Sequence, residues 1–169
     1  MILDWDALRK VRGRCALVSG MFDPIHEGHV QYLEAATRYA LPLLCAVAPD
    51  AEVAMKHPPL VPEDQRVRVL DSLKPVTYTH LASKGLRAVI SQAEPVVLVK
   101  GVDWQGKLDD LPVRVMHTDT AFESSTRLLK DYQRRLDEQA AARFEQFVTT
   151  QVDPEKPWEP VTDYSFEAR

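Results

Sequence analysis

Two histidines stand three residues apart in a short polar stretch, where His26 and His29 flank Glu27 and Gly28. A neutral imidazole donates a hydrogen bond from one ring N–H, and two rings at this spacing lie on adjoining parts of one helix face. Gly28 lets a ligand come close to the backbone because it has no Cβ. The pair is therefore suited to holding an anion such as a phosphate group.

Zinc is an alternative ligand for the same residues, with Asp23 as the third group. No further cluster of Cys or His completes such a site. The order His-Glu-Gly-His also misses the zinc-protease pattern, in which the second histidine comes one residue later. A purely structural capping role for both rings is the weaker alternative. We expect a phosphate site and no dedicated metal site.

The histidines fall at a turn between a strand and a helix. Residues 15–18 form an apolar run typical of a buried strand, whereas Val30, Leu33, Ala36 and Ala40 recur at helical intervals. At the start of a helix the first N–H groups lack internal partners, and the helix dipole adds partial positive charge. The backbone alone therefore favours an anion at this turn.

Apolar runs and amphipathic segments alternate along the rest of the chain. We expect strands at residues 15–19, 41–48, 75–80, 95–99 and 113–116, and helices at 4–12, 30–40, from 62, 86–93 and from 124. The last helix has a predicted buried side made of Leu128, Tyr132, Leu136, Ala140 and Phe144. Apolar strands without alternation are typical of a parallel sheet covered on both faces. The predicted fold is α/β, a Rossmann-like doubly wound parallel sheet of about five strands in a single domain with an extended C-terminal tail.

Three polar loops follow predicted strands, at residues 20–29, 100–107 and 118–127. The carboxyl ends of parallel strands meet at one edge of a sheet, where ligands of this fold class bind. We therefore expect these loops around one pocket, with residues 49–60 overhead.

The composition fits an ordinary single domain: 169 residues, 45% hydrophobic and 27% charged. No apolar run approaches the ~20 residues that span a bilayer, and the first residues lack the pattern of a signal peptide. We expect a cytoplasmic protein with no membrane contact. The cysteines, Cys15 and Cys45, fall in predicted strands, and we interpret both as buried small hydrophobes.

The net charge is −4, with Lys and Arg dispersed along the chain. This pattern disfavours polymeric nucleic acid as a partner, because no basic stripe tracks a phosphate backbone. A small anionic ligand is compatible with it, since a local cluster can be positive on a mildly acidic protein.

A resemblance to the cytidylyltransferase-like nucleotidyltransferases rests on two signatures. Residues 20–29 read G-M-F-D-P-I-H-E-G-H and resemble the family's G-x-F-D-x-x-H-x-G-H, and residues 124–127 (S-S-T-R) resemble its late signature. Between them, residues 100–107 (K-G-V-D-W-Q-G-K) are similar to a loop of the glycerol-3-phosphate cytidylyltransferases and of the heptose-1-phosphate adenylyltransferase domains. The helix start at 62–66 is similar to theirs as well. The resemblance covers about residues 14–135 and leaves the leading helix and the tail unaccounted for. We expect a leading helix in 1–13, a nucleotidyltransferase domain in 14–150 and a Pro- and aromatic-rich tail in 151–169.

In that family a phosphate oxygen of an acceptor attacks the α-phosphorus of a nucleoside triphosphate, and pyrophosphate leaves. Catalysis then consists of alignment and charge neutralisation. The resemblance implies that His26 and His29 contact the triphosphate and stabilise the charge that develops at the α-phosphorus. It places Lys56 on a loop that closes over the phosphates, and the alternative is a lysine that is simply solvated. It also implies that the forked guanidinium of Arg127 donates hydrogen bonds to the phosphates. These four residues are the implied catalytic group.

The resemblance also implies two binding groups. Nucleotide contacts are implied at Gly20, Met21, Phe22, Gly28, Gly101, Asp103, Ser124, Ser125 and Thr126. Acceptor contacts are implied at Asp23, Arg66, Lys100, Trp104 and Lys107. The serines and the threonine could instead cap the helix, and Trp104 could anchor its loop. Arg66 could instead be a surface residue, and Asp23 could orient the histidine loop. Mg²⁺ is expected to accompany the triphosphate.

The resemblance leads us to expect an enzyme that joins an NMP unit from CTP or ATP to a phosphorylated sugar or polyol. Residues 118–123 lack the arginine and glycine of the cytidylyltransferase version, which weakens a preference for CTP, and Met21 replaces a common Thr or Cys. The alternatives are an adenylyltransferase for a flavin or pantetheine phosphate and a non-catalytic nucleotide-binding module. Expected partners are a nucleoside triphosphate and a small phosphorylated acceptor, and a homo-oligomer is compatible with the sequence.

Overall fold

A computed structural model describes residues 1–108, 110–119 and 125–151, and for residues 147–151 the backbone alone. The chain divides into two units, the first ending at Arg127 and the second beginning at Leu128. Ser124 and the predicted tail from residue 152 lie outside the described residues. No helix in the described part of the chain is long and apolar enough to cross a lipid bilayer.

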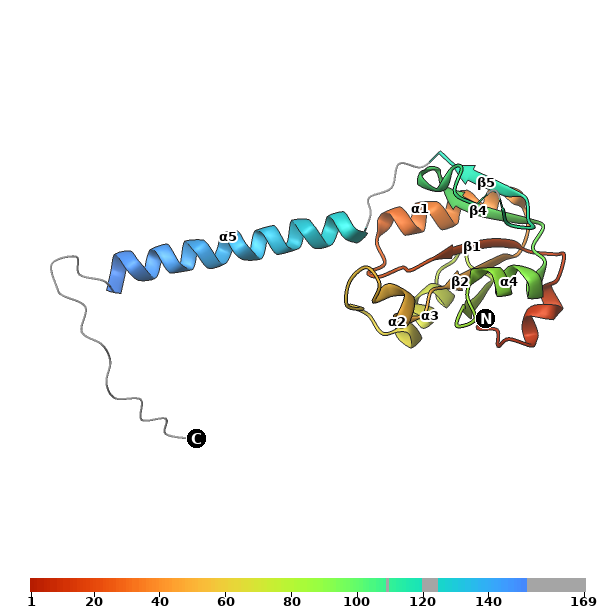
Figure 1. Ribbon diagram of the computed structural model, residues 1–169, viewed down its shortest axis with the longest axis horizontal. Helices are drawn as coiled ribbons and strands as arrows, with labels where there is room; N and C mark the ends of the chain where they lie inside the picture. The colour runs from red at the N-terminus through yellow and green to blue at the C-terminus, as the bar shows by residue number, and fades with distance from the viewer. Residues whose placement is uncertain (109, 120–124, 152–169) are drawn as a thin grey trace, which may run out of the picture. The chain divides into compact units, whose positions relative to one another are not determined.

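Five parallel strands form one sheet in the first unit, in the order β3-β2-β1-β4-β5. Figure 1 shows β5, β4, β1 and β2 side by side in this order. The strands are β1 (Ala16–Gly20), β2 (Leu43–Val47), β3 (Tyr78–Leu81), β4 (Val97–Gly101) and β5 (Val115–Thr118). The order reverses between β1 and β4, and in such folds the ligand crevice opens at that point, beyond the carboxyl ends of the strands. The predicted α/β doubly wound fold is confirmed.

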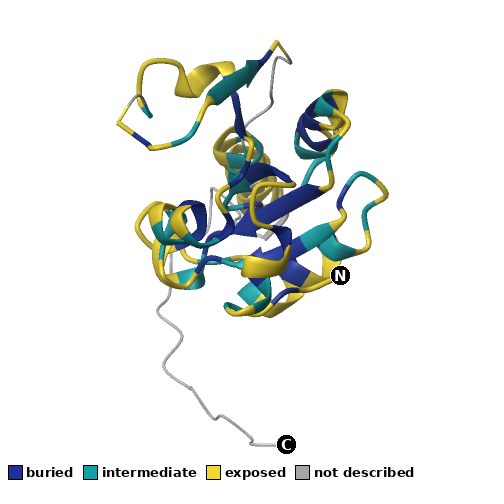
Figure 2. Cartoon of the chain, turned by 90° about the vertical axis from the view of Figure 1, so that its right-hand side faces the viewer, coloured by how far each residue is buried: buried dark blue, intermediate teal, exposed yellow. Residues whose placement is uncertain are grey.

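Helices cover both faces of the sheet. On one face α1 (Glu27–Ala36), followed by the 3₁₀ helix η2 (Thr37–Tyr39), packs together with α3 (Glu63–Asp71) on the strands. On the other face the 3₁₀ helix η1 (Ala7–Val11) packs with α4 (Leu86–Ala93). Side chains of β1 alternate between the two cores, since Val18 enters the first and Leu17 the second. Figure 2 shows the central strands buried and the outer faces of the helices exposed.

The predicted helix over residues 4–12 is shorter in the structure and is of the 3₁₀ type. The Asp4 carboxylate accepts the N–H of Ala7, the first residue of this helix, at 2.7 Å, whereas the N-cap residue Asp6 makes no side-chain cap hydrogen bond. The helix stops because the chain turns at Gly13, whose positive φ of 67° suits glycine and whose N–H donates to the Ala93 and Glu94 carbonyls.

The predicted loop at 49–60 contains a short helix, α2 (Asp50–Val53). Acidic residues in its first turn favour the positive end of the helix dipole. In addition, the N–H of Asp50 donates to the Glu63 carboxylate at 2.7 Å, which ties the helix to the start of α3. Periodicity does not reveal a helix of one turn that is stabilised by a distant side chain.

The helix α5 (Ser125–Gln151) begins within the late signature, as predicted. Its predicted buried side is different in the structure, because Tyr132, Leu136 and Phe144 are exposed. Apart from α5, the second unit has no helix or strand within the described range, so its apolar stripe has no neighbour of that unit to pack on.

Two valines on helices of opposite faces of the sheet test which side chains belong to the core. Val89 on α4 is fully buried, whereas Val69 on α3 is 41% exposed. We expect Val89→Ala to lower the free energy of unfolding by about 1.5–3 kcal/mol, because it removes buried apolar surface and leaves a cavity. Val69→Ala should change it by less than about 0.5 kcal/mol. Urea unfolding of both variants measures the difference. Equal losses of unfolding free energy would contradict the assignment of Val89 to the core and of Val69 to the surface.

Candidate active site

A cavity of about 560 Å³ opens at the carboxyl ends of the strands. The predicted loops after β1 and β4 and the start of α5 meet there, together with α2 and the residues that follow it. The lining consists of Ser19, Gly20, Met21, Phe22, Asp23, His26, His29, Tyr32, Ala46, Ala48, Glu52, Met55, Lys56, His57, Ala82, Leu86, Lys100, Gly101, Asp103, Trp104, Ser125 and Thr126. Most of the residues implied by the resemblance therefore lie around one space.

The two histidine rings stack on each other at the start of α1. Their centroids are 3.9 Å apart, with 30° between the ring planes. His26 is the N-cap residue, with extended backbone, and its carbonyl accepts the N–H of His29 at 2.9 Å. The strand-to-helix turn thus brings both imidazoles to the cavity at the N-terminal end of the helix, where the helix dipole is positive.

His29 is a neutral ring at physiological pH. Burial, and next the neighbouring His26, lower its pKa from 6.5 to about 3. Its Nδ1 atom is buried and has no hydrogen-bond partner among the described residues. A neutral imidazole can donate one hydrogen bond to a phosphate oxygen without bringing a charge of its own.

The loop in front of the histidines has a tight geometry. Phe22 adopts a positive φ of 53°, which is uncommon outside glycine, and its buried ring packs at 4.9 Å from that of His29. A Cβ at Gly20 would lie 3.1 Å from the Phe22 ring. Gly20 is therefore needed for the approach of Phe22, which in turn supports His29.

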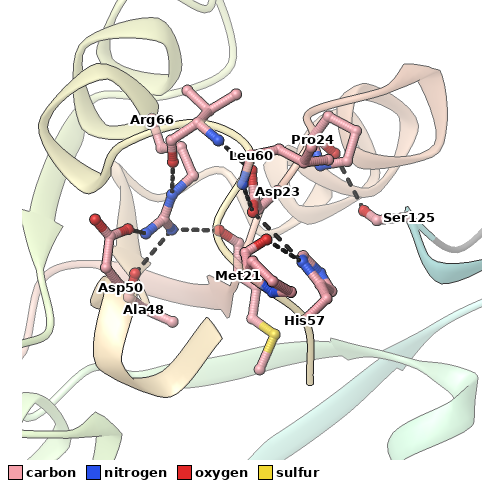
Figure 3. A network of polar contacts seen from close by, with 11 residues as sticks. Met21, Asp23, Pro24, Ala48, Asp50, His57, Leu60, Arg66 and Ser125 are labelled. Carbon is pink, nitrogen blue, oxygen red and sulfur yellow. Dashed lines mark hydrogen bonds and ion pairs between the residues drawn. The ribbon is translucent and has the colours of Figure 1, made fainter. Parts of the chain in front are cut away.

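Asp23 is a buried carboxylate that fixes a second loop. Its oxygens accept the backbone N–H groups of Leu60 and Val61 at 2.8 and 2.9 Å. The next residue, Pro24, accepts the Ser125 hydroxyl at 3.1 Å (Figure 3). Asp23 thus orients the loop around the histidines, one of the alternatives that the sequence left open.

Arg66 lies outside the lining, with its guanidinium turned into the loops beneath the cavity (Figure 3). Its Nη1 donates to the carbonyls of Met21 at 2.6 Å and Ala48 at 2.8 Å, and its Nε to that of Val61 at 2.9 Å. Its Nη2 pairs with the Asp50 carboxylate at 2.6 Å. These bonds give Arg66 a positioning role in the loops, and its expected contact with acceptor phosphate stays a prediction.

Lys100 is 5% exposed and spans the point where the strand order reverses. Its ammonium donates to the carbonyl and hydroxyl of Ser19, at 3.1 and 3.0 Å, and lies 4.2 Å from the centre of the Trp104 ring. Burial lowers the pKa of Lys100 to about 8, against the opposing effect of Asp103 and Glu52. Lys100 brings a positive charge to the cavity wall between β1 and β4.

The remaining implied residues are placed as follows. Lys56 lines the cavity beyond α2, whereas Gly28 is buried within α1. Lys107 lies in an adjoining groove, 5.8 Å from the Trp104 ring centre. Arg127 is exposed on α5 and is not among the lining residues, so its implied phosphate contact remains a proposal.

Residues 17–162 match the cytidylyltransferase-like family. The chain belongs to this family. It is a nucleotidyltransferase, the enzyme class expected from the two signatures.

Relatives of this nucleotidyltransferase carry the name FAD synthase. The protein of Halomicrobium mukohataei is 35% identical over 99 residues, which are 58% of this chain and 69% of that protein. The protein of Methanopyrus kandleri is 33% identical over 127 residues, 72% of this chain and 83% of that protein. The match to the Archaeoglobus profundus protein, 36% identical over 88 residues, spans 52% of this chain and 57% of that relative. The name FAD synthase differs from the glycerol-3-phosphate cytidylyltransferases and the heptose-1-phosphate adenylyltransferase domains, the two subgroups that the loop at 100–107 resembles.

A solved structure shares the fold of this nucleotidyltransferase. It is the lipopolysaccharide core biosynthesis protein from Thermoplasma volcanium GSS1, with a TM-score of 0.55 and 21% identity. The match covers 64% of this chain and 98% of that one.

No group of three or more His, Cys, Asp or Glu side chains that could hold a metal occurs in the part of the nucleotidyltransferase that the structure describes. Glu52, Asp23 and Asp103 all line the cavity without forming such a group. Mg²⁺ accompanying the triphosphate stays a prediction from the sequence.

Several lining residues of the nucleotidyltransferase were not expected from the sequence, among them Ser19, Tyr32, Glu52 and His57. Tyr32 follows His29 by three residues and so lies one helical turn away, a spacing that could have found it. Its hydroxyl donates to the Val99 carbonyl at 2.5 Å, which ties α1 to β4. His57 directly follows Lys56. Its position next to the lysine implied by the resemblance could have predicted that it lines the cavity.

Two arginines on α3 separate a buried ion pair from an exposed one. We expect Arg66→Met to lower the free energy of unfolding by about 3 kcal/mol, because three carbonyls and Asp50 lose their donor. Arg66→Lys should lose nearly as much, since an ammonium lacks the planar fork.

Arg68→Met is the matched control, because the Arg68–Asp64 pair is exposed and should contribute less than about 0.5 kcal/mol. Urea unfolding of the three variants measures these values. Similar stability of Arg66→Met and Arg68→Met would contradict the positioning role.

Neutral His29 makes the stability of the fold depend on pH. In the unfolded chain the ring takes up a proton below about pH 6.5, whereas in the folded protein it stays neutral down to about pH 3. The unfolded state binds more protons in this window, so the free energy of unfolding falls as the pH falls through it. Between about pH 7 and pH 4.5 we expect His29→Gln to lose less stability than the wild type, by about 1 kcal/mol or more. Urea unfolding at both pH values tests this, and equal losses would mean that folded His29 is charged.

Proposed function

We propose that this nucleotidyltransferase transfers AMP from ATP to FMN, forming FAD and pyrophosphate. The observation that carries the proposal is the stacked pair of His26 and His29 on a cavity that extends to the start of α5. The names of the relatives support the acceptor, because a FAD synthase matches this chain over 83% of its own length. They favour a flavin phosphate over the sugar or polyol phosphate that was the first expectation from the sequence.

The cavity has a size and lining that suit two flat ring systems and a chain of phosphates. Its volume of about 560 Å³ lies within the range of small-molecule sites. Small and apolar side chains, Ala46, Ala48, Met55, Ala82 and Leu86, share the wall with the indole of Trp104. Aromatic rings stack favourably on such surfaces.

In the proposed reaction a phosphate oxygen of FMN forms a bond to the α-phosphorus of ATP. The bond from that phosphorus to the oxygen bridging to the β-phosphate breaks, and its electron pair leaves with pyrophosphate. A phosphate monoester is largely a dianion at pH 7, because its second pKa is about 6, so the attacking oxygen needs no general base. The protein then has to align the two phosphates and stabilise charge.

The residues divide this work. His26 and His29 donate hydrogen bonds to the oxygens of the α-phosphate, where charge develops. Ser125 and Thr126 hold the β- and γ-phosphates at the start of α5, with Lys56 facing them from its loop. Lys100, beside Trp104, takes the FMN phosphate at the point where β1 and β4 diverge. Mg²⁺ enters with ATP and neutralises part of its charge.

A direct assay tests the proposed activity. The protein is incubated with ATP, FMN and Mg²⁺, and FAD and pyrophosphate are measured by chromatography. We expect FAD to form with ATP and not with CTP, and His29→Ala to lower kcat by about 10²–10³-fold, because a donor to the developing charge is lost. His117→Ala, outside the cavity lining, is the control for a histidine substitution as such.

Other outcomes would assign the site differently. Pyrophosphate release with sugar or polyol phosphates but not with FMN would move the acceptor to the first expected class. Tight ATP binding without release from any acceptor would leave a nucleotide-binding module.

A further inference from the structure

His57 is a third imidazole at the cavity, supplied by the segment between α2 and α3 rather than by α1. It lines the cavity, and its side chain is 18% exposed. Its Nδ1 lies 3.0 Å from the Pro58 carbonyl, so a proton on Nδ1 is donated there. Nε2 is then the ring nitrogen left for a ligand. As a neutral group Nε2 presents a lone pair, whereas in the imidazolium it presents a donor.

A buried carboxylate lies against this ring. The Asp23 side chain is fully buried, and its Oδ2 is 3.8 Å from Nδ1 of His57 (Figure 3). Asp23 already accepts the N–H groups of Leu60 and Val61, which hold its oxygens in place. The hydrogen bond between Nδ1 and the Pro58 carbonyl orients the ring, and the carboxylate at 3.8 Å attracts it electrostatically when the ring is charged.

Other ionisable side chains of the lining face the same space. They come from the chain next to His57 (Lys56), from α2 (Glu52) and from the start of α1 (His26 and His29). Pro24, the residue after Asp23, is bonded to Ser125 at the start of α5. The contacts of His57 therefore place it by the loop that receives Ser125, the residue assigned above to the β- and γ-phosphates.

We propose that His57 is a further catalytic residue, which donates a proton from Nε2 to the leaving pyrophosphate. As the bond between the α-phosphorus and the bridging oxygen breaks, that oxygen keeps the electron pair and takes the proton. His57 is left neutral and regains a proton from water. The proposal rests on the nucleotidyl transfer proposed above, in which pyrophosphate leaves whatever the acceptor is.

The two kinds of histidine then have different tasks. Near neutral pH the ring of His29 is uncharged, because its pKa is about 3, so it cannot act as an acid. Its one N–H acts as a hydrogen-bond donor. His57 is paired with a carboxylate instead of a second imidazole. The Asp23 carboxylate, 3.8 Å from Nδ1, is a counter-ion for the charged form of His57.

Proton uptake tests the protonated state without an acceptor. Pyrophosphate with Mg²⁺ is titrated into the wild type, His57→Gln and His117→Gln by calorimetry at pH 8, in buffers of different ionisation enthalpy. Binding that requires the imidazolium of His57 takes up a proton wherever the free ring is neutral. We expect wild type and His117→Gln to take up more protons than His57→Gln, by up to about one, and His57→Gln to bind about tenfold more weakly. Equal uptake and affinity in all three would overturn the proposal.

The dependence on the leaving group tests the proton transfer itself. ATP analogues with a β,γ-difluoromethylene or a β,γ-methylene bridge release leaving groups of lower and higher basicity. An acid that protonates the leaving group reduces the rate difference between them. We expect His57→Gln to lower kcat about 10²-fold and to enlarge the ratio of the two analogue rates. A lower kcat with an unchanged ratio would leave His57 as a binding group and overturn the proton transfer.

Circular dichroism and urea unfolding establish that His57→Gln is folded, and His57→Asn serves as a second variant. Proton uptake that depends on His57 in a protein that forms no FAD would overturn FMN as the acceptor and support the role of His57. FAD formation with unchanged kcat in both His57 variants would overturn that role and support the acceptor.

Discussion

The guanidinium of Arg66 is removed from water between three segments of chain, and a buried charge is costly unless every donor finds a partner. Here the partners are carbonyls of the segments that follow β1 and β2, together with the Asp50 carboxylate at the start of α2. A lysine could not replace it, because the planar fork reaches several acceptors at fixed angles. The loop that carries the histidines and the helix that precedes Lys56 are therefore held by the same cation. The hydrogen bonds and the ion pair of Arg66 are all made within the protein. The cations that line the cavity are Lys56 and Lys100.

Asp23 adds the second constraint on these loops. It lies next to Phe22, whose ring supports His29, and it holds the backbone at Leu60 and Val61. Arg66 also donates to the carbonyl of Val61, so the buried charges of Asp23 and Arg66 both hold the backbone at residues 60–61. Lys56 and His57 precede that segment in the chain. The position of the segment that carries Lys56 and His57 thus depends on the contacts that Asp23 and Arg66 make with the residues that follow it.

Sequence periodicity was sufficient for the strands, for their parallel pairing and for the turn that carries His26 and His29. It could not find the partners of Arg66, because Met21 lies 45 residues away in the chain and nothing local marks a carbonyl that will need a donor. For the same reason Arg66 was expected at the ligand rather than beneath it. On α5 the pattern identified an apolar stripe but not what would cover Tyr132 and Phe144. His57 was missed because a lone histidine in a loop has no spacing to recognise.

The arrangement of charge also bears on turnover. Pyrophosphate carries several negative charges, and a cavity lined by cations alone would hold substrate and product equally well, which does not accelerate the chemical step. In this cavity His29 is kept neutral by burial and by His26, so it contributes a donor rather than a charge. Lys100 has a pKa of about 8, close enough to neutrality for a bound phosphate to bias its charge. The strongest permanent cation near the loops, Arg66, faces away from the ligand. Lys56 and Lys100 therefore supply positive charge at the cavity, while the neutral ring of His29 supplies a hydrogen-bond donor.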